Sequence, residues 1–143
     1  MEISDVRRKL RDAVAEAKRN AADRRSRHDE ASRAWADALE RIVLPVCRQV
    51  VNVLKAEAHP VQIFTPADHV RIGFESRPQD FVELVLQADG SEAIVLGRIS
   101  QSRGRETITE ERAFVRGGAA IAAMTEEQVL DFVSNALAGI LVR

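Results

Sequence analysis

The architecture of this chain follows from residues 31–57, ASRAWADALERIVLPVCRQVVNVLKAE. Its apolar residues recur every three or four positions, beginning with Ala31, Trp35 and Leu39, which is the spacing of a helix packed on a core. Toward residue 57, valine and leucine occupy so much of the helix circumference that we expect burial on most sides. Pro45 lacks an amide hydrogen and clashes with the preceding turn, so a kink or short break is predicted around residues 41–45.

Upstream, residues 1–30 continue the helical pattern without a break, and the first glycine of the chain is Gly73. A thin apolar seam with alternating steps of three and four, as in a coiled coil, is formed by Ile3, Val6, Leu10, Ala13 and Ala17. A continuous helix of about 55 residues would reach roughly 80 Å. The helix is therefore predicted either to fold back near residues 20–30 or to project as a stalk.

The segment RRSRHDE, residues 24–30, has three possible interpretations: an arginine cluster for nucleic acid, a ligand site around His28, or a solvated helix surface. No second metal-binding residue lies three or four positions from His28. Opposite charges do lie at helical spacing, in the pairs Arg25–Asp29 and Arg27–Glu30. We therefore favour the solvated surface.

Downstream of residue 60 the apolar period changes to two, which is typical of strands. The predicted strands are Val61–Thr65, His69–Glu75, Phe81–Gln87, Ala93–Gln101 and Glu106–Arg116. Turns are predicted at residues 65–68, 76–80, 89–90 and 102–105. Gly117 and Gly118 end the sheet, and Thr125 with Gln128 forms a capping box that begins the last helix.

These elements predict an α+β fold: a long N-terminal helix or helical hairpin, a five-stranded antiparallel meander sheet, and a C-terminal helix packed on one sheet face. We expect a single domain over residues 1–143. Within it, residues 1–30 are predicted to project or pair, and residues 31–143 to form a compact core.

Two predicted hairpin turns set the strand register. A two-residue turn at Asp89-Gly90 would pair Leu84 with Val95 and Val82 with Gly97. A turn at Arg103-Gly104 would place Ile108 opposite Ile99, and a bulge is expected near Arg112 and Phe114. The resulting apolar row is the predicted core face, covered by residues 31–57 and the C-terminal helix.

The opposite sheet face is half apolar, which is unusual for a solvated face. Its large apolar residues are Phe81, Val85, Ile94 and Leu96. A cluster of this kind usually marks an interface. We expect either a dimer or partner interface here, or a cover supplied by the N-terminal helix or the segment GGAAIAAM, residues 117–124.

Charge, cysteine content and the lack of long apolar segments indicate which partners and which compartment to expect. The chain has 21 basic and 22 acidic residues, so no net charge draws it to polyanions or membranes. Cys47 is the single cysteine and cannot form an internal disulfide. The N-terminus lacks the apolar run of a signal peptide, and residues 42–54 are too short and too interrupted to span a bilayer. We expect a soluble cytoplasmic protein with no membrane association.

Catalytic motifs are weak. His59 and His69 flank the first predicted strand near Glu57 and Asp68, but strand ends lie apart. Cys47 lies in an apolar helix with no histidine placed to activate it. No glycine-rich phosphate loop and no nucleophile elbow occurs. We expect no enzymatic activity, no cofactor and no metal.

The favoured hypothesis is therefore a non-enzymatic, self-associating protein–protein interaction module. Its predicted interface residues are Val6 and Leu10 of the seam and the apolar cluster of the second sheet face. We expect a homodimer, with another protein as a possible partner. One alternative is nucleic-acid binding through the hairpin 98–116, at Arg98, Arg103, Arg105 and Arg112. Interleaved Glu106, Glu110 and Glu111 instead favour cross-strand ion pairing there. A further alternative is small-ligand binding between sheet and helices.

Overall fold

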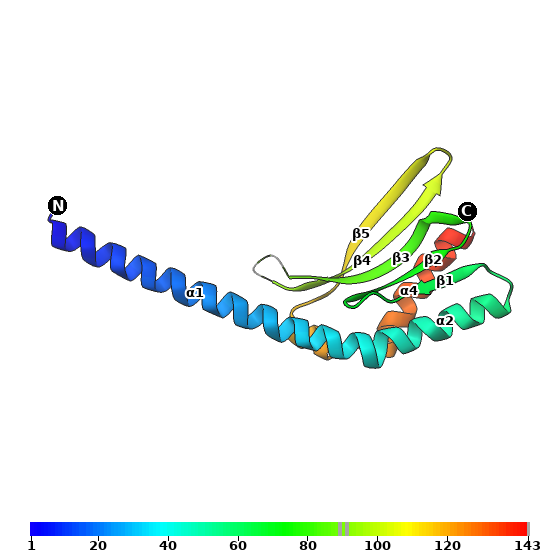
Figure 1. The fold of residues 1–143 in the computed structure, drawn as a ribbon, viewed down its shortest axis with the longest axis horizontal. Helices are drawn as coiled ribbons and strands as arrows, with labels where there is room; N and C mark the ends of the chain where they lie inside the picture. The colour runs from blue at the N-terminus through cyan, green and yellow to red at the C-terminus, as the bar shows by residue number, and fades with distance from the viewer. Residues whose placement is uncertain (89, 91, 143) are drawn as a thin grey trace.

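A helical rod forms the N-terminal third of the computed structural model, which describes residues 1–88, 90 and 92–142. Helix α1 runs from Ile3 to Ala38, a π-helical turn η1 spans Leu39–Val43, and α2 spans Leu44–Ala56. Helix α1 does not fold back; its N-terminal part projects away from the rest of the molecule (Figure 1). The long helix is confirmed, and of the two predicted forms the structure adopts the stalk.

The π-helical turn is the break predicted near Pro45. Pro45 occupies the first turn of α2, where its missing amide hydrogen leaves the preceding helical bond unformed. Just before it, the Leu44 N–H donates to the Leu39 carbonyl, five residues back instead of four. This widened turn absorbs the clash of the proline ring and lets the rod bend without ending.

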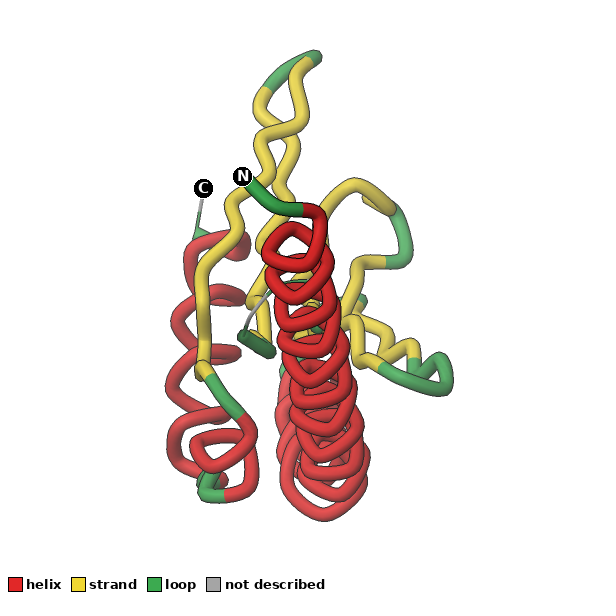
Figure 2. The backbone as a smooth tube through the Cα atoms, turned by 90° about the vertical axis from the view of Figure 1, so that its left-hand side faces the viewer, coloured by secondary structure: helices red, strands yellow, loops and turns green. Residues whose placement is uncertain are grey.

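The five strands form one antiparallel meander, as predicted. Their bounds are β1 Val61–Phe64, β2 His69–Phe74, β3 Arg77–Gln87, β4 Ile94–Arg103 and β5 Glu106–Arg116. Each strand pairs with its neighbour in the chain, in the order β1-β2-β3-β4-β5. The helices lie on one side of this sheet and leave the other side open (Figures 1 and 2). We refer to the side away from the helices as the open face.

The connections between the strands differ from several of the predicted turns. The turn expected at residues 76–80 is confined to residues 75–76, because Phe74 already pairs with Arg77 and β3 begins there. The connection between β3 and β4 covers residues 88–93, because Gln87 pairs with Ile94. Asp89, on which the two-residue turn was predicted, lies outside the described residues.

Register follows from these turns. Leu84 pairs with Gly97 and Val82 with Ile99, two residues from the predicted partners. A shift of two keeps every side chain on its predicted face, because side chains alternate with a period of two.

The β4–β5 turn is also displaced from its predicted position. Arg103 pairs with Glu106, so the turn residues are Gly104 and Arg105, and Gly104 has φ +64°, which is typical of the first position of a tight hairpin turn. Ile108 therefore lies opposite Gln101, not opposite Ile99.

The predicted bulge in β5 is confirmed. Val95 pairs with Val115 and Leu96 with Ala113, which leaves Phe114 as the extra residue. The Phe114 ring packs on Phe132 of the last helix, with ring centroids 5.4 Å apart.

Two helices complete the chain. The short α3, Gly118–Ala122, follows directly after the sheet, and α4 spans Glu126–Leu141. The capping box is confirmed: Thr125 Oγ1 accepts from the Gln128 N–H at 3.2 Å, and Gln128 Oε1 accepts from the Thr125 N–H at 2.9 Å. Together they satisfy two backbone donors and fix the first turn of α4.

The core lies between the helices and the sheet. Fully buried side chains from both layers meet there, among them Val43, Val51, Ile72, Leu84, Val95, Ile121, Val133 and Ile140.

The prediction that residues 31–57 are buried on most sides is wrong for the far side of α2. Val53 is 58 % exposed, because the sheet covers α2 from one side and α4 lies along another, which leaves the far side open.

Candidate interaction surfaces

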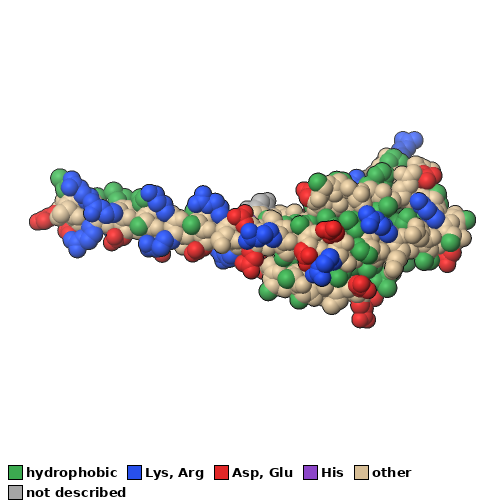
Figure 3. Space-filling view, turned by 60° about the horizontal axis from the view of Figure 1, so that its bottom comes forward, with side chains coloured by type: hydrophobic (Ala, Val, Ile, Leu, Met, Phe, Trp, Pro, Cys, Tyr) green, Lys and Arg blue, Asp and Glu red, His purple; other side chains and the backbone are tan. Residues whose placement is uncertain are grey.

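The projecting part of α1 carries an exposed apolar stripe. Ile3, Val6, Leu10 and Val14 are 76 %, 41 %, 61 % and 51 % exposed. Their steps of three and four residues place them on one side of the helix. Green hydrophobic atoms follow one edge of the projecting helix, with charged side chains around the rest (Figure 3). We call these four residues the α1 stripe.

The RRSRHDE segment lies where α1 reaches the body of the molecule. The ring nitrogen Nε2 of His28 is 2.8 Å from the carbonyl oxygen of Gly90, in the connection between β3 and β4. The predicted pairs Arg25–Asp29 and Arg27–Glu30 are not among the ion pairs of the described residues. The segment is mostly exposed, as predicted, but His28 holds one side of it against Gly90, between β3 and β4.

The apolar cluster of the open face is less accessible than the sequence suggested. Leu96 is 9 % exposed, and Phe81, Val85 and Ile94 are partly buried. The Arg71 guanidinium lies over the Phe81 ring, 4.0 Å from its centroid. Neither cover predicted within the chain is present, because α1 projects away and α3 packs on α1, with Ile121 in the core.

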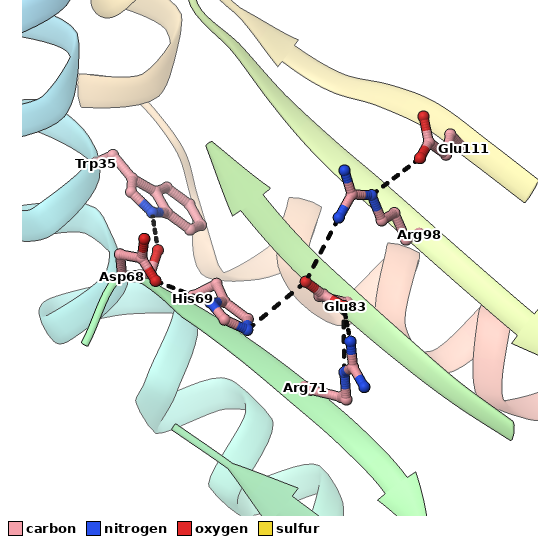
Figure 4. Close-up of polar contacts among 7 residues, drawn as sticks. All are labelled: Trp35, Asp68, His69, Arg71, Glu83, Arg98 and Glu111. Atoms are coloured by element: carbon pink, nitrogen blue, oxygen red, sulfur yellow. Dashed lines mark hydrogen bonds and ion pairs between the residues drawn. The ribbon is translucent and has the colours of Figure 1, made fainter. Parts of the chain in front are cut away.

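A buried carboxylate organises the open face (Figure 4). Glu83 is 4 % exposed and accepts two hydrogen bonds from Arg71, at 3.2 and 2.7 Å. Arg98 Nη1 lies 3.8 Å from the second carboxylate oxygen, and Arg98 Nε donates to Glu111 on β5 at 3.0 Å. These partners offset the cost of taking a carboxylate out of water. The sequence analysis missed Glu83; the one signal was an acidic residue inside the apolar run FVELVL.

The same network reaches helix α1. His69 Nε2 is 3.6 Å from Glu83, and its Nδ1 is 2.9 Å from the Asp68 carboxylate, whose pKa this hydrogen bond lowers. The Trp35 indole N–H donates to the Asp68 carbonyl at 2.7 Å (Figure 4). The chain of contacts explains why His69 is held in place. Within the described residues, no group of three histidine, cysteine or acidic side chains is arranged to hold a metal ion.

The arginines proposed for nucleic-acid binding fall into two groups, those that form ion pairs and those that do not. Arg98 pairs with Glu111 across the strands, and Arg112 with Glu110 at 2.7 Å. Arg103 and Arg105 lie at the β4–β5 turn and form no ion pair with another described residue. Cross-strand ion pairing is thus confirmed for Arg98, while the hairpin tip retains two unpaired cations.

An apolar groove runs between α2 and α4. Its volume is about 430 Å³, and its walls are mainly aliphatic, including Val46, Val50, Val53, Leu130, Ala138 and Leu141. Leu130 is 45 % exposed at its edge. The sequence analysis assigned the α2 wall, including Val46, Val50 and Val53, to the core; the signal for a groove was the excess of apolar residues on α2 and α4 beyond one seam.

Two further hollows bear on ligand binding. A hollow of about 260 Å³ lies between α4 and strands β4 and β5, next to Phe132 and Gly139. Another, on the open face of β1 to β3, includes Phe64, Arg71 and Phe81. Neither places His59 or Cys47 among its lining residues. Burial raises the pKa of the Cys47 thiol to about 12, which keeps it protonated and unreactive near neutral pH.

None of the helices formed by the described residues combines the length and the apolar character needed to cross a bilayer. No protein-family model, no curated protein and no solved structure matches this chain.

Proposed function

We propose that this protein is a non-enzymatic interaction module that associates with copies of itself through helix α1. The observation that carries the proposal is the α1 stripe: four large apolar side chains, each at least 41 % exposed, on a helical segment that extends beyond the core. Isolated exposed apolar residues are common, but a row of them on one side of a helix is typical of an interface.

Energetics support the same assignment. Full burial of a valine, leucine or isoleucine side chain contributes about 1.5–3 kcal/mol. Covering Val6 and Leu10 would thus add several kcal/mol to association, before the entropy cost of bringing two chains together. The projecting segment also gains by it, since a helix with no tertiary contacts is marginally stable in water. The open-face cluster is a weaker candidate, because Leu96 is already buried and Phe81 lies under Arg71.

Light scattering on a sizing column tests the proposal. The full chain has a mass of 15.9 kDa and is expected to elute as a dimer or larger assembly. A Val6→Gln/Leu10→Gln variant removes the centre of the stripe without changing charge or helix propensity appreciably, and should elute as a single chain.

The matched control is Arg8→Gln/Asp12→Gln. These residues each follow a stripe residue by two positions, about 200° around the helix, and the pair of changes also leaves the net charge unchanged. The control should associate like the unmodified chain. An unmodified chain that stays at 15.9 kDa throughout a concentration series overturns the proposal.

A further inference from the structure

We infer that the α1 stripe of one copy docks in the groove between α2 and α4 of a second copy. This inference rests on the proposed function and names the partner surface for the stripe. The groove is the complementary feature, since it presents aliphatic walls from two helices and exposed apolar residues, Val53 and Leu130, at its margins. A helix laid between two others buries its apolar side from both.

The dimensions of stripe and groove agree. At 1.5 Å per residue, the stripe from Ile3 to Val14 is about 16 Å long. The groove walls extend for about 12 Å along α2, from Val46 to Leu54, and for about 22 Å along α4. The four stripe residues therefore match the length of the groove.

Charge favours this contact over pairing of two α1 helices. Residues 3–19 contain six basic and three acidic residues, whereas α4 contains three acidic residues and no basic one. The acidic residues are Glu126, Glu127 and Asp131. Two α1 helices would bring like net charges together. In the groove, α1 beside α4 brings opposite charges together, although α2, the other wall, carries Arg48 and Lys55, so the attraction acts on the α4 side.

The thin apolar seam of α1 also favours docking in the groove over pairing of two α1 helices. Two of the five positions of the seam are alanine, Ala13 and Ala17, so two α1 helices would bury little area between them. A groove with two walls compensates for a narrow stripe.

The groove cannot be filled by the α1 of the same chain. Helix α1 is continuous to Ala38 and leads away from the body, whereas the groove begins beyond the π-helical turn (Figure 1). An α1 stripe that fills the groove therefore belongs to a second copy. Stripe and groove are different surfaces, so the contact is heterologous, and each copy offers one of each.

Two full-length variants, each with one surface blocked, test this contact. The stripe variant is Val6→Gln/Leu10→Gln, and the groove variant is Val53→Gln/Leu130→Gln. Because Val53 and Leu130 are 58 % and 45 % exposed, the groove variant should keep its fold, which the fluorescence of the buried Trp35 reports. A control for the groove variant is Phe64→Gln/Ile108→Gln, which changes two apolar residues of similar exposure, 47 % and 41 %, on the strands.

We expect each blocked variant to elute alone at 15.9 kDa and an equimolar mixture of the two to elute at twice that mass, since one stripe and one groove remain intact. The control should associate as the unmodified chain does. If the groove variant still associates while the stripe variant does not, the docking site is wrong and the proposed function stands. A mixture that stays monomeric also overturns the docking site. An unmodified chain that never associates overturns both.

Discussion

Arg71 and Glu83 lie directly opposite each other on β2 and β3, and the Arg71 guanidinium donates two hydrogen bonds to one oxygen of the Glu83 carboxylate. The two partners differ in their access to water: the Arg71 side chain is 40 % exposed, and that of Glu83 is 4 %. Loss of one partner therefore has a different consequence from loss of the other, because only Glu83 would remain as a buried charge.

We expect Arg71→Gln to lower the free energy of unfolding by about 2–3 kcal/mol, because Glu83 keeps only the longer contacts to Arg98 and His69. Glu83→Gln should cost about 1 kcal/mol, because the released Arg71 reaches water. Urea unfolding of both variants at neutral pH measures the difference. A larger loss for Glu83→Gln would contradict the interpretation that burial of the carboxylate dominates.

The raised pKa of the buried Cys47 thiol should make the protein less stable at alkaline pH. Burial raises its pKa from 9.0 to about 12, so above pH 9 the unfolded chain releases a proton that the folded chain retains. The unfolded state then binds fewer protons, and stability should fall by about 1.4 kcal/mol per pH unit between pH 9 and 12. Other groups titrate there too, so the measurement is the difference in unfolding free energy between the natural chain and Cys47→Ala. A difference that does not change with pH would show that the thiol ionises freely in the folded state.

Gly97 is a position where the sheet requires the absence of a side chain. A methyl group there would overlap the Phe132 ring, the partner of Phe114. We expect Gly97→Ala to destabilise the fold by about 1–3 kcal/mol, as overpacking does. Thermal unfolding should show partial recovery when Phe132→Leu is added.

Gly139 provides the contrasting case. Apart from its chain neighbours and the nearby backbone of its own helix, no atom of the described residues lies within 4 Å of an added methyl group, and the residue lies inside helix α4. Gly139→Ala should stabilise the protein by about 0.5–1 kcal/mol, because alanine loses less conformational freedom in a helix. A destabilised Gly139→Ala protein would show that the space beside α4 is needed open.

The hairpin tip tests the nucleic-acid alternative. Arg103 and Arg105 form no ion pair with another described residue, while Glu106 lies opposite Arg103 on β5. We expect no binding to duplex DNA in a fluorescence titration at low salt. Binding that weakens with salt by about one log unit per phosphate contact, and that disappears in Arg103→Gln/Arg105→Gln, would support the alternative instead.

The sequence was sufficient for the elements and for their faces. Periods of three to four and of two separated helices from strands, Pro45 marked the break in the rod, and Thr125 with Gln128 marked the start of α4. The core face of β3 and β4 was also correct although their register was wrong by two, because a shift of two leaves every side chain on its original face. These features depend on residues close together in the chain.

The tertiary structure alone decided how distant residues meet. Periodicity cannot report that Gln87 pairs with Ile94, or that Glu83 is buried among Arg71, Arg98 and His69. Nor could it show that the apolar far sides of α2 and α4 remain open as a groove, since an apolar residue has the same pattern whether another helix covers it or not. Burial depends on which elements pack together, and local sequence records only which side of each element is apolar.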